Sequence, residues 1–478
     1  MINTECGIFG CISNTYLPQS SCIDGLKNLQ HRGRESFGIS YLQGTNLLVE
    51  KYIGEVTDIS YSQPSCLWLG HVRYSTSGNI KNNLQFTQPL LHTNNKYLGQ
   101  YIIAHNGNIP EYVWNALYKK YTDFLIPQDK IYNDTQLLVL FIEFLSKKMG
   151  DIEYLWKKIL VNILNDIPGA YSLVVLTPDE TFLLRDKYAI RPLIYTEINT
   201  NSNTIFISSE NCAFSEDFPF KDVGAGEIIK INNNDLTSEQ IYKIPVNKLI
   251  QNCVFEYIYF LRGGTTVDGI SAKAFRTSLG IMLSQQIKVQ TQDIFDSWRE
   301  NDALICGVPV SGIHFGNSMA TALNLQYSQF LTKRAGYPYR SFIMKTTEER
   351  LEACKRKFQI EDNTIRDRVI VLVDDSIVRG NTLVFLVKFL KSYQPKEIHF
   401  ISGSPPVKYP CHYGMDFPDI EELVANQIPR ENLAQHFGLD SLTYLDINNL
   451  IKITQNFDLS EKNERKMCNA CFTGNYLF

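Results

Sequence analysis

The stretch from 371 to 382 decides the fold of the second half of this chain, and it reads Val371-Leu372-Val373-Asp374-Asp375-Ser376-Ile377-Val378-Arg379-Gly380-Asn381-Thr382. An apolar run typical of a buried strand ends here in two adjacent acids. A short loop with one glycine follows, and helical spacing of apolar residues covers 383–390. Another buried-strand run occupies 304–308. Such strands alternating with helices predict a doubly wound α/β domain with a mostly parallel sheet, whose ligands sit beyond the carboxyl ends of strands.

Two interpretations of the acidic loop are open on pattern alone. An acidic turn followed by a helix cap is about as frequent as a binding loop. Paired acids at a strand end can instead hold ribose hydroxyls or Mg²⁺, and loop amides at a helix N-terminus suit a phosphate. The chain has no Gly-x4-Gly-Lys-Ser/Thr loop, and Gly224-Ala225-Gly226 lacks the third glycine of a dinucleotide fingerprint.

The first half of the chain has a different pattern. Short β-type runs, such as 67–72, 101–104, 171–176 and 205–207, alternate with turn residues, and two stretches near 134–148 and 150–165 show helical spacing. This mixture predicts an α+β domain of layered sheets flanked by helices. The polar stretch 231–252 is the expected boundary. A length of 478 residues also favours two domains.

Composition excludes several classes of protein. The net charge of −4 is too small for a nucleic-acid footprint. No apolar run reaches the ~18 to 20 residues that span a bilayer, and the first residues do not resemble a secretory signal. We therefore expect a cytoplasmic protein that binds neither nucleic acid nor membrane. In that compartment eleven cysteines favour catalytic or metal-binding roles over a disulfide framework.

Cys6 begins an apolar run after a five-residue leader. For a lone cysteine a small buried hydrophobe is much the commoner role. The functional interpretation requires removal of residues 1–5, which exposes the α-amino group of Cys6. That amine has a pKa of roughly 8, low enough to act as a base at neutral pH. Thiol and base would then belong to one residue, as in other N-terminal nucleophiles.

Further motifs follow Cys6 in order: His31-Arg32-Gly33, Gly70-His71-Val72-Arg73-Tyr74-Ser75-Thr76, Ala104-His105-Asn106-Gly107-Asn108 and Asn133-Asp134-Thr135. Singly, a charged residue here is more often solvated, and Asn-Gly is more often a turn. Together the motifs resemble those of the class II (N-terminal nucleophile, Ntn) glutamine amidotransferases. The resemblance implies an αββα Ntn-hydrolase sandwich.

By this resemblance Cys6 is the nucleophile, while Asn106, through its side-chain amide, and Gly107, through its backbone N–H, form the oxyanion hole. Arg73 would bind the α-carboxylate of glutamine and Asp134 its α-ammonium, with His31 and Arg32 also at the glutamine site. These assignments match each charge with its chemical partner. A carboxylate suits a guanidinium fork, and a tetrahedral oxyanion suits preorganised N–H donors.

The acidic loop resembles the signature loop of the type I phosphoribosyltransferases, which bind phosphoribosyl pyrophosphate (PRPP). This resemblance implies that Asp374 and Asp375 contact ribose hydroxyls and Mg²⁺. The rest of the implied PRPP site consists of Ser376, Ile377, Val378, Arg379, Gly380, Asn381 and Thr382, together with Lys333 and Arg340.

A class II glutaminase followed by this loop resembles the amidophosphoribosyltransferases, with matches along nearly the whole chain. The implied organisation is a propeptide 1–5, a glutaminase domain 6–235 and a phosphoribosyltransferase domain 250–478. The implied reaction hydrolyses glutamine and channels ammonia to C1 of PRPP, which gives 5-phosphoribosylamine and pyrophosphate in the first step of purine synthesis. Glucosamine-phosphate and asparagine synthases, which lack a PRPP loop, and a regulator that has lost catalysis fit the motifs less well.

A subgroup of this family carries a [4Fe–4S] cluster on four thiolates, and its positions are cysteine here: Cys253, Cys411, Cys468 and Cys471. Four thiolates suit zinc as well as iron–sulfur, and the resemblance favours iron–sulfur. It also implies a homodimer or homotetramer and purine-nucleotide effectors. Departures from the family pattern at 263–265, 308–312 and 333–340 leave open an alternative, a specialised amidotransferase that uses PRPP or another sugar phosphate outside purine synthesis.

Overall fold

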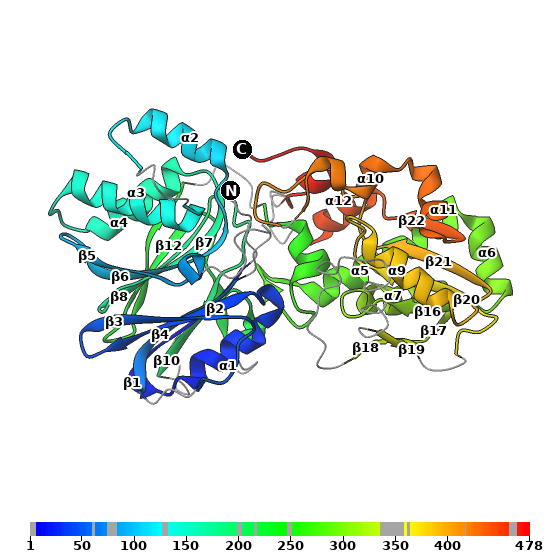
Figure 1. Cartoon of the computed structure of the whole chain (residues 1–478), viewed down its shortest axis with the longest axis horizontal. Helices are drawn as coiled ribbons and strands as arrows, with labels where there is room; N and C mark the ends of the chain where they lie inside the picture. The colour runs from blue at the N-terminus through cyan, green and yellow to red at the C-terminus, as the bar shows by residue number, and fades with distance from the viewer. Residues whose placement is uncertain are drawn as a thin grey trace.

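The computed structural model describes residues 6–59, 63–73, 84–126, 132–197, 203–214, 218–245, 251–334, 358–360, 364–415, 417–457 and 466–478. The expected propeptide 1–5 and Arg340 lie outside the described residues. Figure 1 shows an N-terminal lobe of stacked sheets and a C-terminal lobe built around a smaller sheet, with the C-terminal end of the chain near the junction.

The N-terminal lobe contains a first, antiparallel sheet. Its strands lie in the order β11 (Phe220–Asp222), β9 (Ile194–Thr196), β10 (Thr204–Ser208), β1 (Cys6–Leu17), β4 (Ser65–Arg73), β2 (Ser36–Gln43) and β3 (Asn46–Ile53). The motif residues Cys6 and Arg73 are Cα partners at the paired ends of β1 and β4. The local strand pairing therefore brings two residues together that are far apart in sequence.

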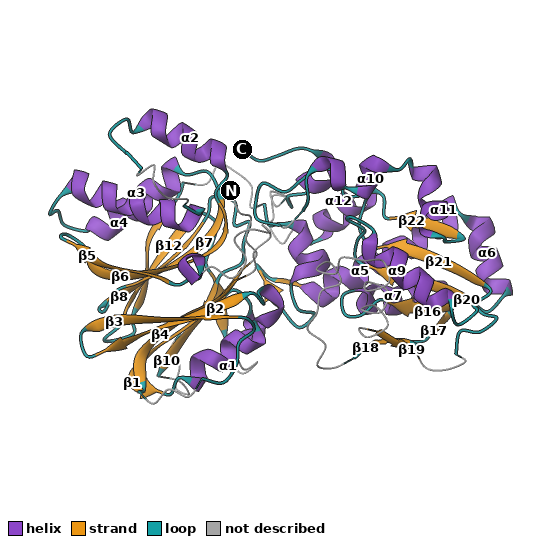
Figure 2. Cartoon of the chain, in the orientation of Figure 1, coloured by secondary structure: helices purple, strands orange, loops and turns teal. Residues whose placement is uncertain are grey.

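A second antiparallel sheet packs against the first (Figure 2). Its strands lie in the order β13 (Ser238–Lys243), β12 (Glu227–Asn232), β8 (Glu180–Arg185), β7 (Ala170–Leu176), β6 (Gly99–Asn108) and β5 (Leu90–Asn95). β13 belongs to this sheet, so the strand pairing of the sandwich extends past residue 235. β6 carries Asn106 and Gly107 near its end, where they pair with β7.

Helices cover the two outer faces. The helix α1 (Ser20–Asn28) packs its buried Leu26 with Phe9 and Trp68 of the first sheet. The outer face of the second sheet carries α2 (Glu111–Lys120), α3 (Asp134–Met149) and α4 (Leu155–Asp166). Apolar side chains such as Ile8 and Val174 fill the space between the sheets. The predicted αββα Ntn-hydrolase layering is thereby confirmed.

The C-terminal lobe contains a parallel sheet in the order β17 (Gln326–Tyr327), β16 (Leu304–Gly307), β20 (Val369–Asp374), β21 (Glu397–Ser402) and β22 (Ser441–Tyr444). Every neighbouring pair in that order is parallel. One face packs on α5 (Ala272–Gln290) and α7 (Gly312–Leu323), and the other on α9 (Asn381–Lys391) and α11 (Leu433–Phe437). The predicted α/β phosphoribosyltransferase domain is confirmed.

Shorter elements complete this lobe. The hairpins β14–β15 and β18–β19 and the remaining helices have the bounds β14 (Thr266–Val267), β15 (Ile270–Ser271), β18 (Leu331–Lys333), β19 (Phe358–Ile360), α6 (Gln292–Glu300), α10 (Val424–Gln427), α12 (Ile447–Asn456) and α13 (Ala470–Thr473). A π-helical turn, Glu256–Phe260, lies at the start of the lobe. Within the described residues, none of the helices has the length and apolar character needed to cross a bilayer.

Candidate active sites

The cysteine site lies at the end of the first sheet. Cys6 is fully buried at the start of β1, and its carbonyl oxygen accepts a hydrogen bond of 2.9 Å from Arg32 Nε. Arg73, its partner across the sheet, is 1% exposed. Burial lowers the pKa of Arg73, and the nearby acidic groups of Cys6, Glu35 and Asp134 partly oppose that effect. The guanidinium therefore lies within electrostatic reach of both the thiol and Asp134.

Polar atoms without partners mark this site. Nε and Nη2 of Arg73 are buried and make no hydrogen bond, and the same holds for both side-chain polar atoms of Asn106. Buried polar groups in proteins are almost always hydrogen-bonded, because an unpaired one costs about 1–3 kcal/mol. A fork of guanidinium nitrogens and a primary amide left without partners therefore favour a ligand that supplies oxygen acceptors here.

The backbone at Gly107 requires glycine. Its φ is +149°, and a Cβ there would lie 1.9 Å from the carbonyl oxygen of Ala170 on the neighbouring strand. Asp134 stands at the start of α3, where Asn133 and Gln136 form a reciprocal capping box. The Asp134 carboxylate accepts hydrogen bonds from Ile109 N (3.2 Å) and Thr135 N (2.8 Å). The start of α3 therefore places the Asp134 carboxylate beside the end of β6, the strand that carries Asn106 and Gly107.

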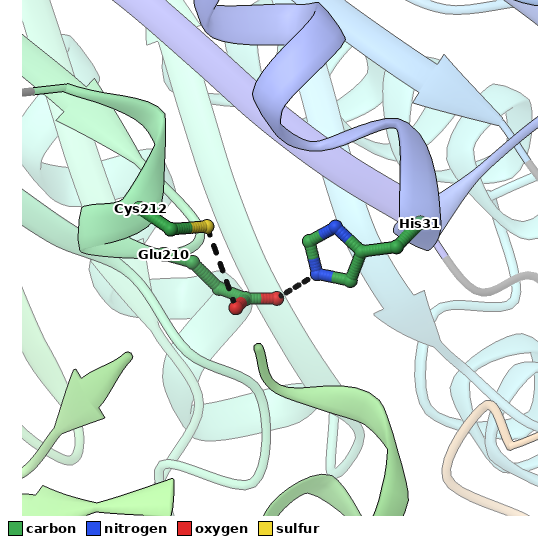
Figure 3. Close-up of side chains that lie close together, drawn as sticks. All are labelled: His31, Glu210 and Cys212. Atoms are coloured by element: carbon green, nitrogen blue, oxygen red, sulfur yellow. Dashed lines mark hydrogen bonds and ion pairs between the residues drawn. The ribbon is translucent and has the colours of Figure 1, made fainter. Parts of the chain in front are cut away.

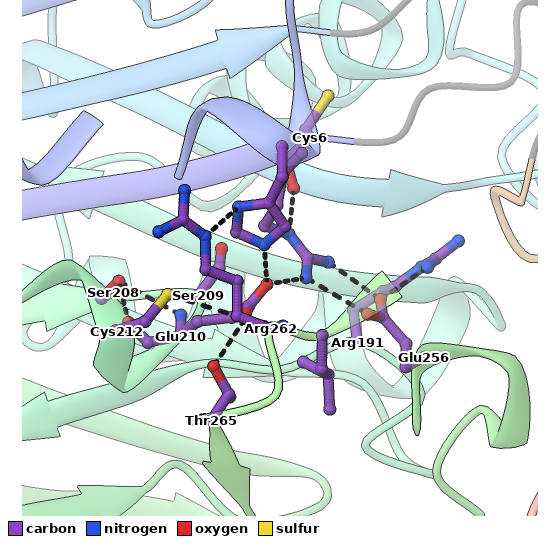
Figure 4. A network of polar contacts seen from close by, with 12 residues as sticks. Cys6, Arg191, Ser208, Ser209, Glu210, Cys212, Glu256, Arg262 and Thr265 are labelled. Carbon is purple, nitrogen blue, oxygen red and sulfur yellow. Dashed lines mark hydrogen bonds and ion pairs between the residues drawn. The ribbon is translucent and has the colours of Figure 1, made fainter. Parts of the chain in front are cut away.

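His31 and Arg32 bond to a polar network that includes Glu210 and Glu256, which Figure 4 labels. Arg32 donates to Glu210 Oε1 at 2.6 Å and to Glu256 Oε1 at 2.9 Å. Glu256 also accepts from Arg191 Nη1 at 2.7 Å. Arg191 belongs to the N-terminal lobe, and Glu256 belongs to the π-helical turn at the start of the C-terminal lobe. The network therefore crosses the junction between the two lobes.

Glu210 is the most heavily bonded member of the network. Its Oε1 lies 2.7 Å from His31 Nε2, and its Oε2 accepts from Thr265 Oγ1 (2.7 Å) and from the backbone N–H of Arg262 (2.9 Å). Burial alone would raise the pKa of Glu210, but the charges of His31 and Arg32 outweigh it and hold that pKa well below its usual value. Glu210 is therefore an ionised hub between the lobes.

His31, Glu210 and Cys212 lie close together (Figure 3), and each offers one possible metal-ligand atom within 4.8 Å of the others. One observation argues against a metal ion at this place. The carboxylate of Glu210 is already engaged by Arg32, whose fixed positive charge repels a cation. We interpret the set as part of the polar network.

The acidic loop lies at the carboxyl end of β20, a strand that pairs with β16 on one side and β21 on the other in the parallel sheet (Figure 1). Asp374 ends the strand, and Asp375 accepts hydrogen bonds from Ser376 Oγ at 2.7 Å and from Ser311 Oγ. Ser311 precedes α7 in the loop that follows β16. The carboxyl ends of two neighbouring parallel strands therefore meet at this acidic pair, as the topology of the fold requires.

Gly380 closes the loop and begins α9. It adopts φ +74°, in the left-handed region, and a Cβ there would meet the Phe437 ring at 2.5 Å. Between the acids and this glycine, Ile377 is buried and Arg379 Nε bonds Glu422 at 2.8 Å. The residues 376–382 thus form a compact turn at a helix N-terminus, which suits an anion. Lys333 ends β18 in a hairpin with β19.

The four cysteines of the expected cluster come together. Cys253, Cys411, Cys468 and Cys471 line one pocket whose other walls are apolar or aromatic: Phe255, Tyr413, Met415, Phe417, Ala470 and Tyr476. Cys253 and Cys468 form an isolated β-bridge, which holds two of the four sulfur-bearing residues side by side. Three separate segments of the chain therefore deliver four soft sulfur donors to one dry site.

Sequence reasoning did not assign roles to Glu210, Glu256 or Arg191. The structure also adds Ser311 and Arg276. Arg276 is buried and donates to carbonyl oxygens of the π-helical turn, including Tyr257 O at 2.9 Å. Burial lowers the pKa of Arg276, while the nearby acidic groups of Asp375 and Glu210 oppose this. It thus lies between the two candidate sites.

Comparisons with known proteins agree with both halves. Residues 71–216 match the glutamine amidotransferase domain and residues 282–402 the phosphoribosyl transferase domain. The amidophosphoribosyltransferase of Bacillus subtilis is 32% identical, over 99% of this chain and 94% of the relative. Its crystal structure, a glutamine PRPP amidotransferase complexed with ADP and GMP, has a TM-score of 0.80 at 30% identity and covers 99% of this chain and 97% of that one. A solved structure of an allosteric regulatory enzyme of purine biosynthesis has a TM-score of 0.81 at 31% identity, and the match covers 99% of this chain and 96% of that chain.

Proposed function

Because this chain belongs to the amidophosphoribosyltransferases, which catalyse the first committed step of purine synthesis, we propose that Cys6 releases ammonia from glutamine and that the 374–382 loop holds the PRPP that receives it. The observation that carries this assignment is the set of buried, unpartnered donors of Arg73, the strand partner of Cys6, and of Asn106 near the end of β6. The alternative of a specialised acceptor outside purine synthesis is not favoured, because the match to these enzymes covers nearly the whole chain.

In the glutaminase half, removal of residues 1–5 exposes the α-amine of Cys6, which takes the proton of the thiol. The thiolate attacks the carboxamide carbon of glutamine, and the oxyanion that forms is stabilised by Asn106 Nδ2 and the backbone N–H of Gly107. One such donor is typically worth about 10²–10³ in kcat. Ammonia then leaves, and water hydrolyses the thioester to release glutamate. Support comes from the orphaned amide of Asn106 and the glycine-only backbone at Gly107.

The α-substituents of glutamine find opposite charges beside the thiol. Arg73 has two donor nitrogens available for the α-carboxylate, and Asp134 lies within its electrostatic reach, ready for the α-ammonium. His31 and Arg32 would serve this site through position, because Arg32 fixes the carbonyl of Cys6 and both side chains are tied to Glu210. A bidentate guanidinium–carboxylate contact gives both orientation and affinity.

In the phosphoribosyl half, residues 376–382 wrap the 5′-phosphate at the start of α9, with Lys333 and Arg340 as further cationic contacts for PRPP. Asp374 and Asp375 take the ribose hydroxyls and Mg²⁺, since hard carboxylate oxygens at a strand end fit that ion. Mg²⁺, when bound, neutralises charge on the departing pyrophosphate. Ammonia passes inside the protein from the glutaminase to C1 of PRPP, and pyrophosphate leaves.

The pocket lined by Cys253, Cys411, Cys468 and Cys471 fits an iron–sulfur cluster as a structural staple. The four cysteines line this pocket together with apolar and aromatic side chains. Among the described residues, the group whose possible ligand atoms all lie within 4.8 Å of one another is His31, Glu210 and Cys212, and it includes none of these four sulfurs. One zinc ion, with bonds of about 2.3 Å, would hold its sulfur ligands closer together than that. Iron and labile sulfide in brown protein support the cluster; colourless protein with stoichiometric zinc refutes it.

The decisive experiment measures pyrophosphate release from PRPP with glutamine or with free ammonia. Cys6→Ala is expected to lose the glutamine-dependent reaction and keep the ammonia-dependent one. Cys66→Ala, on the neighbouring strand β4, is the matched control and should keep both. Absence of pyrophosphate with either donor in the unaltered enzyme would eliminate the proposal. Mass of the active protein tests the removal of residues 1–5.

Regulation and assembly follow the same family pattern. The Bacillus subtilis enzyme was crystallised with ADP and GMP, so purine nucleotides are the effectors that we propose for this chain. A homodimer or homotetramer in the cytoplasm is the proposed state, and sedimentation with and without nucleotide measures the assembly. Titration of glutamine-dependent activity with GMP and ADP tests the effectors.

A further inference from the structure

The oxyanion strand of the glutaminase is in contact with a loop of the other domain, Cys411–Met415. Asn108 follows the Asn-Gly pair on β6, and its Nδ2 donates to the carbonyl oxygen of His412 at 2.8 Å. Gly414 also lies against this strand end, since a Cβ on it would lie 3.2 Å from the carbonyl carbon of Gly107 and 2.8 Å from Arg191 Nη2. The loop therefore packs directly on the peptide unit that follows Gly107.

Two segments pack closely on Gly107. The backbone of Ala170 leaves no space for a side chain on it, and an added Cβ on Gly414 would lie 3.2 Å from its carbonyl carbon. Because an oxyanion-hole donor acts only when aimed at the developing charge, a small displacement of Gly107 lowers the rate. The loop of the phosphoribosyltransferase domain thus forms one wall that keeps the glutaminase donor in place.

The loop itself is fixed by directed bonds. Arg191 donates to the carbonyl of Tyr413 through Nε (3.1 Å) and Nη2 (2.8 Å), while its Nη1 bonds Glu256. The sulfur of Cys411 accepts the backbone N–H groups of Tyr413 (3.3 Å) and Met415 (3.4 Å). Two carbonyls of the loop are therefore presented to the glutaminase by a tight turn, with a guanidinium fork on one of them.

The network continues from this loop to the nucleophile. Glu256 receives Arg191 and Arg32, and Arg32 donates to the carbonyl of Cys6. Both halves of the thiol chemistry, the attacking residue and the oxyanion donor, are consequently braced against the same loop. We propose that Cys411–Met415 is a positioning element for the glutaminase, acting through Asn108, Gly107 and Arg191 on the oxyanion hole.

This inference rests on the proposed glutaminase role of Cys6 and Gly107, and the test separates the two. Asn108→Ala removes the bond to His412, and Gly414→Ala places a methyl group against Arg191 and Gly107. Gly54→Ala is the matched control, because Gly54 has the same φ of +97° and nothing lies within 4 Å of its added Cβ. Any backbone strain is then equal, and the contact alone differs.

Asn108→Ala and Gly414→Ala are both expected to lower kcat for glutamine hydrolysis by at least about tenfold. This loss is smaller than the ~10²–10³-fold decrease in kcat that complete loss of an oxyanion-hole donor causes. KM for glutamine, ammonia-dependent synthesis and alkylation of Cys6 by iodoacetamide are expected to stay within about twofold, as in the Gly54→Ala control. Alkylation needs the thiolate but no oxyanion hole, so it reports whether the nucleophile is intact.

Wild-type kcat in both loop variants would overturn the inference. So would an equal loss of ammonia-dependent synthesis, which indicates general damage to the fold, or an increase in KM alone, which indicates a role in glutamine binding. Failure of the proposed function is recognised separately, because the unaltered enzyme would then hydrolyse no glutamine. Asn108→Asp, which sets a carboxylate against the carbonyl of His412, is expected to reduce kcat more than Asn108→Ala does.

Discussion

Replacement of Glu210 by glutamine is the sharpest test of the network between the domains. The change preserves shape but removes the negative charge that faces Arg32 at 2.6 Å and His31 at 2.7 Å. It also turns one acceptor into an NH₂ group, although Thr265 and the N–H of Arg262 both donate to this carboxylate. At least one donor is consequently left without an acceptor in a site that is 0% exposed.

The expected loss of stability in Glu210→Gln follows from the charge of Arg32, which stays buried in the variant. Removing one partner of a buried ion pair typically costs about 3–5 kcal/mol, because the other charge is left uncompensated. Arg32 retains its contact with Glu256, so the lower end, about 3 kcal/mol, is expected for Glu210→Gln. Glu239→Gln is the matched control: its carboxylate pairs with Lys230 at 2.7 Å but is 60% exposed, and we expect a change within about 0.5 kcal/mol.

Urea-induced unfolding followed by tryptophan fluorescence measures the difference, since Trp68, Trp114 and Trp156 all report on the N-terminal domain. The pH dependence gives an independent check. The pKa of Glu210 is held below its usual value, so its stabilisation is present above about pH 4.3 and lost as the pH falls through the lowered pKa. The difference in the free energy of unfolding between wild type and Glu210→Gln should therefore become smaller below about pH 4.3. A variant that unfolds within about 0.5 kcal/mol of wild type at pH 7 would refute the reasoning.

Three further outcomes test the separate sites. Gly380→Ala, which forces a methyl group against Phe437 at a φ of +74°, should weaken PRPP binding at least about tenfold in ammonia-dependent assays, whereas Gly44→Ala, at φ +62° with open space, should not. Arg73→Lys should raise KM for glutamine by about tenfold or more and leave ammonia-dependent synthesis unchanged, because a lysine cannot form the guanidinium fork; an unchanged KM contradicts that role. Removal of iron by a chelator should make the 466–478 segment, which carries Cys468, sensitive to limited proteolysis, and equal protection in both forms would show that no cluster staples it.

The elements that local pattern specifies were predicted well. The buried-strand run that ends in the acids Asp374 and Asp375 and the helical run 383–390 appear as β20 and α9, and the helical spacing near 134–148 appears as α3. The period of apolar residues is a local property, and it directly determines which face of a helix or strand is buried. The layering of both domains follows from many such faces, which is why the fold class was accessible from sequence.

The bonds between the domains were not accessible in the same way. Glu210 lies 178 positions from Arg32 along the chain, and Asn108 lies 304 positions from His412. No local period encodes such a partner, and an isolated Glu or Arg in a sequence is far more often solvated than fully buried. Ser311 was similarly hidden, because only the parallel pairing of β16 with β20 brings it to Asp375.

The buried charges alternate in sign along the junction, in the order Glu210, Arg32, Glu256 and Arg191. Their formal charges cancel, so desolvation of the set is opposed by attraction at each step, whereas loss of a single member leaves one charge unbalanced. Well-packed apolar side chains would often be at least as stable in such a place. An apolar interface, however, has no preferred register, because burial of apolar area is non-directional. Guanidinium forks accept partners only in fixed geometries, which sets the carbonyls of Cys6 and Tyr413 in one relation to each other. This relation serves the proposed mechanism, because the proposed nucleophile Cys6 and the loop that packs on the proposed oxyanion donor Gly107 are held from opposite ends of the same chain of bonds.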